Sequence, residues 1–240
     1  MENKDLINRF YELYERASVT GRPVYTDFLD LSSSDVLSGL SLYPEPETYG
    51  GYEGAERVMA CFGEPDRYPF KCLCVSPKDM KFADKFTHRD ILGAILNLGI
   101  KRQTTGDIII RENRAYVFVC DTVCDLIINE LHRVKRTAVV CAVSELPDGA
   151  AAVTEDKKAT VSSLRADCVV SAVFGLSRSG AKDMFLSGLI FIRGKECGDP
   201  SYELKENDVV SVRGRGKFRY CGQDGVTGKG RLRISCKLYK

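Results

Sequence analysis

Three basic side chains in the C-terminal third of the sequence are spaced so that they could bind a phosphate group. Arg178 and Lys182 lie one helical turn apart in a predicted helix. Ser177, which directly precedes Arg178, is a residue type that caps helix N-termini. Unpaired backbone N–H groups and the macrodipole favour an anion at such an N-terminus, and Arg165 lies on the preceding predicted helix. We therefore expect Arg165, Arg178 and Lys182 to bind a phosphate of a nucleic-acid backbone.

Two short helices and a strand, predicted within residues 163–195, must position these side chains. Apolar residues recur at helical spacing in both helical segments, and each segment ends at a glycine, Gly175 and Gly188. The predicted buried faces consist of Leu164, Cys168, Val169, Ala172, Val173, Ala181, Met184 and Phe185. An ordinary helix-turn-helix with a solvated basic edge is the alternative interpretation.

Four motifs follow one another in this region. They are L-R-x-D at 164–167, S-R-S-x-A-K at 177–182, G-L-I-x-I-x-G-K at 188–195 and E-N-D-V-V-S-V-R-G at 206–214. In this order they resemble the S4 RNA-binding domain, a small α/β module with a helix pair packed on a small sheet. The resemblance implies RNA contacts at Arg165, Arg178, Ser179, Lys182 and Lys195, and we add Arg193, which stands where the domain usually has an asparagine.

The closing part of the chain carries basic residues at every second position. If its two segments are strands, one face of each is apolar and the other is basic. The predicted basic strip consists of Arg213, Arg215, Lys217, Arg219, Arg231, Arg233 and Lys237, and Asp224 is the only acidic residue between 209 and 240. Exposed strand faces are generally polar, but ordinary surfaces mix both signs of charge, so we expect the strip to position an RNA backbone.

The charge of the chain is unevenly distributed. Residues 160–240 carry 15 Lys and Arg against 8 Asp and Glu, whereas residues 1–159 carry 20 against 25. The C-terminal third is therefore the expected nucleic-acid-binding part.

The composition indicates a folded, soluble chain. Hydrophobic residues make up 44% of the 240 residues, no apolar run reaches the length of a membrane span, and the N-terminus lacks the apolar core of a secretion signal. We expect a cytoplasmic monomer whose 10 cysteines are reduced and mostly buried. Cys72 and Cys74, and Cys120 and Cys124, lack a second matching pair, so neither a metal nor another cofactor is predicted.

The first two thirds of the chain predict an α+β fold. Residues 5–18 form an amphipathic helix with Leu6, Phe10, Leu13 and Ala17 on one stripe. A short helix is predicted after an N-cap within residues 32–34, and a strand follows the glycine-rich residues 50–57. Between residues 68 and 143 the pattern is β-α-β-β-α-β, a split-βαβ sheet of the RRM or ferredoxin-like kind with its helices on one face.

The middle sheet carries a candidate second RNA surface. Tyr116 and Phe118 alternate with Val117 and Val119, and RNA-recognition folds stack bases on such aromatic pairs. The aromatic pair is equally compatible with packing against the N-terminal segment. Two local basic clusters complete this candidate surface: Arg89, Lys101 and Arg102, and Arg133, Lys135 and Arg136.

Three further motifs extend the resemblance over nearly the whole chain. They are G-G-Y-E-G-A-E-R at 50–57, T-H-R-D-I-L-G-A-I-L-N-L-G-I-K-R at 87–102 and G-D-I at 106–108. These motifs resemble the YlmH family of bacterial S4-domain proteins. The resemblance implies an RNA-binding protein associated with the large ribosomal subunit, which contacts rRNA, tRNA or peptidyl-tRNA during rescue of stalled ribosomes, and it implies a link to cell division.

The expected domains are an N-terminal α+β region at residues 1–66, an RRM-like domain at 67–145, a linker at 146–157 and the S4-like domain at 158–240. The alternative to a non-catalytic RNA-binding protein is an RNA-modifying enzyme, a pseudouridine synthase or methyltransferase, with its catalytic part in residues 1–155. No G-x-G-x-x-G follows a predicted strand, and His88 and His132 have no evident nucleophile. A second alternative is an adaptor for the division machinery, for which RNA binding would be weak and insensitive to salt.

Overall fold

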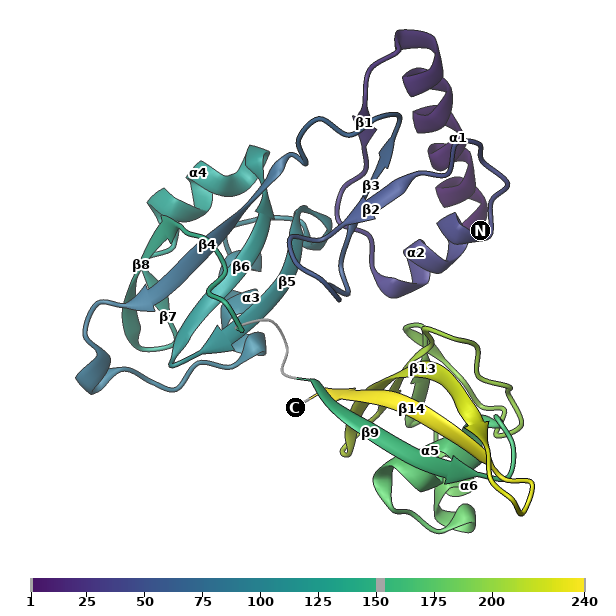
Figure 1. Cartoon of the computed structure of the whole chain (residues 1–240). Helices are drawn as coiled ribbons and strands as arrows, with labels where there is room; N and C mark the ends of the chain where they lie inside the picture. Colours follow the sequence, from purple (N-terminus) through teal and green to yellow (C-terminus); the bar gives the residue numbers. More distant parts are fainter. Residues whose placement is uncertain (1, 150–153, 240) are drawn as a thin grey trace. The chain divides into compact units, whose positions relative to one another are not determined.

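The structure is a computed structural model that describes residues 2–149 and 154–239 (Figure 1). The chain forms two compact units, Met1–Ala151 and Ala152–Lys240, which we call unit 1 and unit 2. Both units combine helices with antiparallel strands, which confirms the predicted α+β class.

Unit 1 begins with two helices and a small sheet whose strand order is β1-β3-β2. Its elements are α1 (Glu2–Thr20), β1 (Val24–Tyr25), α2 (Leu31–Ser38), β2 (Glu47–Tyr49) and β3 (Met59–Phe62). Phe10 and Leu13 of α1 lie in one core with Phe62, as the apolar stripe predicted. The predicted cap of α2 within residues 32–34 is wrong, because the side chain of Asp30 accepts a hydrogen bond from the backbone N–H of Ser33.

The second part of unit 1 is a five-stranded antiparallel sheet of order β5-β6-β4-β8-β7. Its elements are β4 (Phe70–Pro77), η1 (Met80–Phe82), α3 (His88–Leu96), η2 (Arg102–Thr104), β5 (Thr105–Arg111), β6 (Arg114–Cys120), α4 (Asp121–Glu130), β7 (Arg133–Val134) and β8 (Thr137–Val143). This sequence of elements contains the predicted β-α-β-β-α-β order. Ile91 of α3 and Ile127 of α4 share a buried core with Val117 and Val119 of β6, so both helices cover one face (Figure 1).

The opposite face of this sheet is covered by the N-terminal part of unit 1. Tyr116 and Phe118 are only 6% and 3% exposed, and the Phe118 ring stacks on Tyr52 with 5.6 Å between ring centroids. Gly51 has φ +99°, and a Cβ atom there would lie 2.2 Å from the Phe118 ring, so only glycine allows this close approach. The prediction that Tyr116 and Phe118 stack RNA bases is therefore wrong, because both rings are buried, and the alternative of packing against the N-terminal segment holds.

Unit 2 is a six-stranded antiparallel sheet of order β11-β10-β12-β13-β14-β9 with a helix pair on one face (Figure 1). Its elements are β9 (Thr154–Val161), α5 (Ala166–Phe174), α6 (Arg178–Leu186), β10 (Ile190–Ile192), β11 (Lys195–Glu196), β12 (Val209–Val212), β13 (Gly216–Val226) and β14 (Leu232–Tyr239). Strand β9 starts inside the range predicted as a linker and forms one edge of the sheet.

The helix pair of unit 2 follows the predicted local signals. Gly175 ends α5 with φ +65°, and the Ser177 Oγ atom caps α6 by accepting from the backbone N–H of Gly180 at 3.0 Å. Ala181 and Phe185 of α6 are buried in one core with Val169 and Val173 of α5. The two helices therefore pack on the sheet through the faces that the apolar spacing predicts.

Candidate nucleic-acid interface

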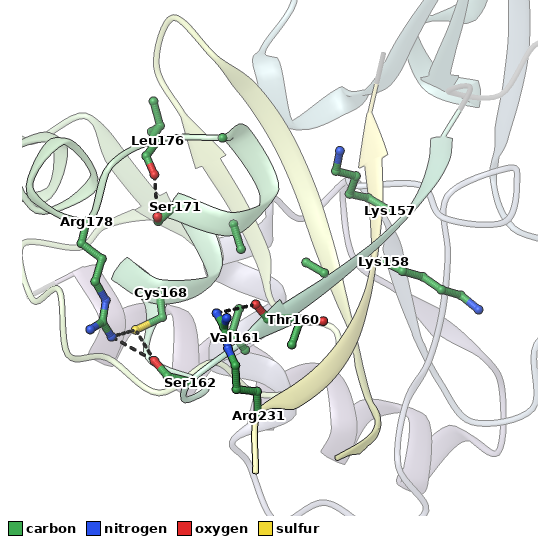
Figure 2. A pocket seen from close by; sticks show the side chains of 13 residues that line it. Lys157, Lys158, Thr160, Val161, Ser162, Cys168, Ser171, Leu176, Arg178 and Arg231 are labelled. Carbon is green, nitrogen blue, oxygen red and sulfur yellow. Dashed lines mark hydrogen bonds between the residues drawn. The ribbon is translucent and has the colours of Figure 1, made fainter. Parts of the chain in front are cut away.

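An open cavity of about 710 Å³ lies in unit 2 between the edge strand β9 and the helix α5 (Figure 2). We call it the β9 groove. Its lining combines basic groups, hydroxyl groups and a floor of small apolar side chains. It consists of Lys157, Lys158, Ala159, Thr160, Val161, Ser162, Cys168, Ser171, Ala172, Gly175, Leu176, Arg178 and Arg231.

Arg178 reaches from the first turn of α6 across to α5. Its Nη2 atom donates to the Ser162 Oγ atom at 3.1 Å and to the Cys168 Sγ atom at 2.7 Å, as Figure 2 shows. The Ser163 Oγ atom also lies 3.4 Å from this sulfur, and Cys168 is 5% exposed. The hydrogen bond to Cys168 raises the pKa of Arg178, so the guanidinium is a fixed positive charge in the groove.

The other basic groups of the groove come from strands. Arg231 precedes β14, and its Nη2 atom donates to the backbone oxygen of Thr160 at 3.2 Å. Lys157 and Lys158 are neighbours on β9, and because successive strand residues point to opposite faces, they leave the strand in different directions (Figure 2). The groove thus presents Lys157 and Arg231 on its strand side and Arg178 on its helix side, and such cations neutralise backbone phosphates.

Arg165 does not line the β9 groove. Its guanidinium pairs with the buried carboxylate of Asp167, with Nε to Oδ1 and Nη2 to Oδ2 both at 3.1 Å. Burial acts to raise the pKa of Asp167, but hydrogen bonds from Arg165 and Cys168 outweigh it and hold the pKa below the ordinary value. Arg165 therefore anchors the start of α5, with its side chain still 42% exposed.

Lys182 and Ser179 lie exposed on α6 outside the groove lining. The Ser179 Oγ atom is 3.1 Å from that of Ser177. Of the three cations predicted to share one phosphate, only Arg178 therefore lines the groove.

The predicted basic strip is partly wrong. Arg213 and Arg215 lie in the turn between β12 and β13, and the Arg213 guanidinium covers the Phe191 ring at 4.4 Å. The strand register instead places Lys217 and Arg219 of β13 beside Lys237 of β14. Because Phe218 and Tyr220 are buried in the helix-facing core, these cations occupy the opposite face of the sheet.

Strand β9 extends this cationic face. Lys158 is opposite Ser235, Arg233 is opposite Thr160, and Asp156 is opposite Lys237. The cationic face therefore crosses β9, β14 and β13. It also carries Asp156, an acidic residue outside the predicted basic strip. We call Lys158, Lys217, Arg219, Arg233 and Lys237 the sheet patch.

Arg193, which is predicted to contact RNA, forms an ion pair with a buried carboxylate. Its Nε atom donates to Oδ1 of Asp208, which is 0% exposed and also accepts from the backbone N–H of Lys205 at 2.8 Å. Arg193 thus neutralises a buried carboxylate and fixes the loop after β10, where its own φ is +49°. Lys195 lies exposed at the start of β11.

Two cations of the candidate second RNA surface in unit 1 are paired with carboxylates. Lys135 lies 3.0 Å from Asp90 and Arg136 lies 3.1 Å from Asp84. Arg102 was predicted as a surface cation, but it is half-buried and donates to backbone oxygens. Arg89, Lys101 and Arg133 are exposed.

Sequence reasoning missed the contribution of β9. Lys157, Lys158, Thr160 and Ser162 line the groove but are not among the predicted site residues, and Lys157 falls in the range 146–157 that Pro147 and Gly149 predict as a linker. The alternation of exposed Lys158 and Thr160 with half-buried Ala159 and buried Val161 was the available strand signal.

The cysteines are all free, and six of them are buried, as expected for small apolar residues. Within residues 2–149 and 154–239, no three His, Cys, Asp or Glu side chains group as a metal site. No helix in the described part of the chain has the length and apolarity to cross a membrane.

Comparison with known proteins finds a family, a relative and a solved structure to which this chain is similar. Residues 71–148 match the family described as "Putative RNA-binding domain in YlmH". The chain is 32% identical over 226 residues to "Ribosome-associated protein quality control protein P2" of Bacillus subtilis (strain 168), covering 90% of this chain and 87% of the relative. A solved structure, "Cell division protein ylmH from Streptococcus pneumoniae", is 21% identical with a TM-score of 0.49, covering 61% of this chain and 93% of that one.

Proposed function

The chain belongs to the YlmH family, and from this premise we propose that it is a non-catalytic, cytoplasmic protein that binds structured RNA of the translation apparatus. The name of the Bacillus subtilis relative places that protein in ribosome-associated quality control. The proposed partners are rRNA of the large subunit, tRNA or peptidyl-tRNA, and the proposed setting is rescue of stalled ribosomes.

The observation that carries the proposal is the β9 groove. Three cations, Lys157, Arg178 and Arg231, line one open cavity together with the hydroxyl groups of Ser162 and Ser171. Lys and Arg neutralise backbone phosphates, and hydroxyl side chains are common donors to phosphate and sugar oxygens. This combination suits the backbone of a folded RNA. RNA is also the ligand that the resemblance of this region to the S4 domain implies.

Shape and backbone recognition fit the rest of the molecule better than base stacking. The aromatic pair of β6 is buried beneath the N-terminal part of unit 1. The sheet patch, by contrast, presents Lys158, Arg233 and Lys237 as exposed cations. We infer that unit 2 positions the protein on RNA mainly through phosphates, which predicts binding that weakens steeply with salt.

Sedimentation with ribosomal particles tests the proposal. The tagged full-length chain is centrifuged with cell extract at low and high salt, and the RNA in each peak is identified. Co-migration with large subunits at low salt, lost at high salt, supports the proposal. A chain carrying Arg178→Ala and Arg231→Ala is expected to leave the particles at lower salt, and Lys182→Ala is the matched control outside the groove.

Absence from every ribosomal particle at low salt would contradict the proposed role. Recovery of free rRNA fragments or free tRNA instead would favour an RNA-modifying enzyme, and analysis of altered nucleosides in that RNA would follow.

A further inference from the structure

Unit 1 contains a cavity of about 450 Å³ beside the segment that precedes α2. Five charged residues line it: Arg9, Asp27, Asp30, Arg57 and Arg102. Arg9 is exposed on α1, whereas Arg57 and Arg102 are half-buried. Apolar side chains, among them Phe10 and Phe28, complete the wall.

Arg57 is held by backbone oxygens from three segments. Its Nε atom donates to Thr105 at 2.8 Å, and its Nη2 atom donates to Phe28 at 2.9 Å and to Arg102 at 3.3 Å. Its backbone N–H also donates to Asp107 at 3.2 Å. Among the described residues its Nη1 group has no protein acceptor, so a fixed guanidinium keeps donors available.

Arg102 shares one acceptor with Arg57. Its Nη1 atom donates to the backbone oxygens of Thr105 at 2.5 Å and Gly106 at 3.2 Å. Within the described part of the chain, its Nε and Nη2 atoms have no protein acceptor. Two guanidiniums anchored to the same carbonyl therefore lie side by side in one cavity.

No carboxylate of the described residues forms an ion pair with either guanidinium, although arginines that are removed from solvent are usually paired. Asp30 accepts from Ser33, and Asp107 accepts from Tyr52 and from the backbone N–H of Glu56. Burial and the neighbouring Arg57 lower the pKa of Arg102 to about 10, which means that its positive charge is incompletely compensated.

We propose that this cavity is a phosphate-binding site in which the free N–H groups of Arg57 and Arg102 grip the oxygens of one phosphate group. Planar guanidinium forks match phosphate oxygens in pairs, and the two forks are fixed before the ligand arrives. Asp27 and Asp30 limit the positive charge of the cavity, so a single phosphate group fits better than a polyphosphate. The site is separate from the β9 groove and does not depend on the proposed function.

Arginine side-chain NMR of the ¹⁵N-labelled full-length chain tests the site. The Nε–H groups of Arg57 and Arg102 are followed while inorganic phosphate is added, against sodium chloride at equal ionic strength. We expect saturable shifts of both signals with phosphate only. Arg102→Gln should weaken phosphate binding at least about tenfold, because charge-assisted hydrogen bonds are lost.

Control variants separate this site from the cations of unit 2. Arg178→Gln should leave the phosphate shifts of Arg57 and Arg102 unchanged. If Arg102→Gln fails to fold, Arg9→Glu replaces it, because Arg9 is exposed and its charge reversal should weaken binding without loss of packing.

The source of the phosphate is resolved with three probes. AMP and a short RNA with a 5′-phosphate are compared with the same RNA carrying a 5′-hydroxyl. Shifts with AMP assign the site to a nucleotide or terminal phosphate, and equal shifts with both RNAs assign it to an internal backbone phosphate. The absence of saturable shifts with all probes, or an unchanged phosphate affinity in Arg102→Gln, would overturn the site while leaving the ribosome experiment unaffected.

Discussion

The guanidinium of Arg178 in α6 lies 2.7 Å from the sulfur of Cys168 in α5. The contact fixes a surface cation by means of a buried residue of another helix, so the charge is held in place in the β9 groove before any ligand binds. Such preorganisation lowers the entropy cost of binding.

Replacement of Arg178 by alanine is expected to weaken RNA binding about tenfold at low salt, because one charge-assisted contact is lost. The slope of log affinity against log salt should fall by about 1. Fluorescence anisotropy with a structured RNA at several salt concentrations measures both quantities. Lys182→Ala, which lies outside the groove, should change both less, and equal effects of the two variants would refute the special position of Arg178.

Asp167→Asn is expected to destabilise unit 2 by about 2 kcal/mol at neutral pH, because the variant loses the charged hydrogen bonds to Arg165. The pKa of Asp167 is lowered in the folded state, so its contribution is present above the ordinary value of 3.8 and is lost as the pH falls through the folded value. Hydrogen exchange of α5 amides should show a gap between wild type and variant that shrinks in acid. A gap that widens on acidification would contradict this assignment.

Phe118→Ala is expected to destabilise unit 1 by about 3–5 kcal/mol, because it opens a cavity beneath Tyr52 and Phe70. Urea unfolding followed by tyrosine fluorescence measures the change in the free energy of unfolding. RNA affinity per folded molecule should stay at the wild-type value, since the ring is 3% exposed. Selective loss of RNA affinity with unchanged stability would restore the base-stacking hypothesis.

Three buried cysteines and the half-buried Cys141 are expected to resist alkylation in the folded protein. Burial raises the pKa of Cys72, Cys120, Cys141 and Cys236 to about 12, so almost no reactive thiolate is present at pH 8. Iodoacetamide labelling followed by peptide mass spectrometry should detect these sites only after denaturation. Half-buried Cys221 is the internal reference that should react first.

Local signals in the sequence predicted the helix pair of unit 2 well. Ser177 and Gly175 act on the backbone within a few residues of themselves, so their effects do not depend on distant parts of the chain. The apolar spacing around Val169 and Phe185 also identified the buried faces correctly.

Predictions that depended on tertiary partners were less successful. In the sequence Arg193 is typical of a surface cation, and only the structure shows its ion pair with Asp208. The burial of Phe118 depends on Tyr52 and Gly51, which are distant in sequence. Period-two spacing through Arg213 and Arg215 also spans a turn, because Gly214 adopts φ +77° between them. The site therefore required the fold, although most of its cations were recognisable by type.

The pairing of β9 with β14 has a consequence for biosynthesis. The two strands form a continuous register from Val161 opposite Leu232 to Thr154 opposite Tyr239, which joins residues more than 70 positions apart. Contacts of such high sequence separation are slow to form, because a long loop must close first. During translation, β9 must wait for β14 to be made, so one wall of the β9 groove is completed only near the end of synthesis of unit 2.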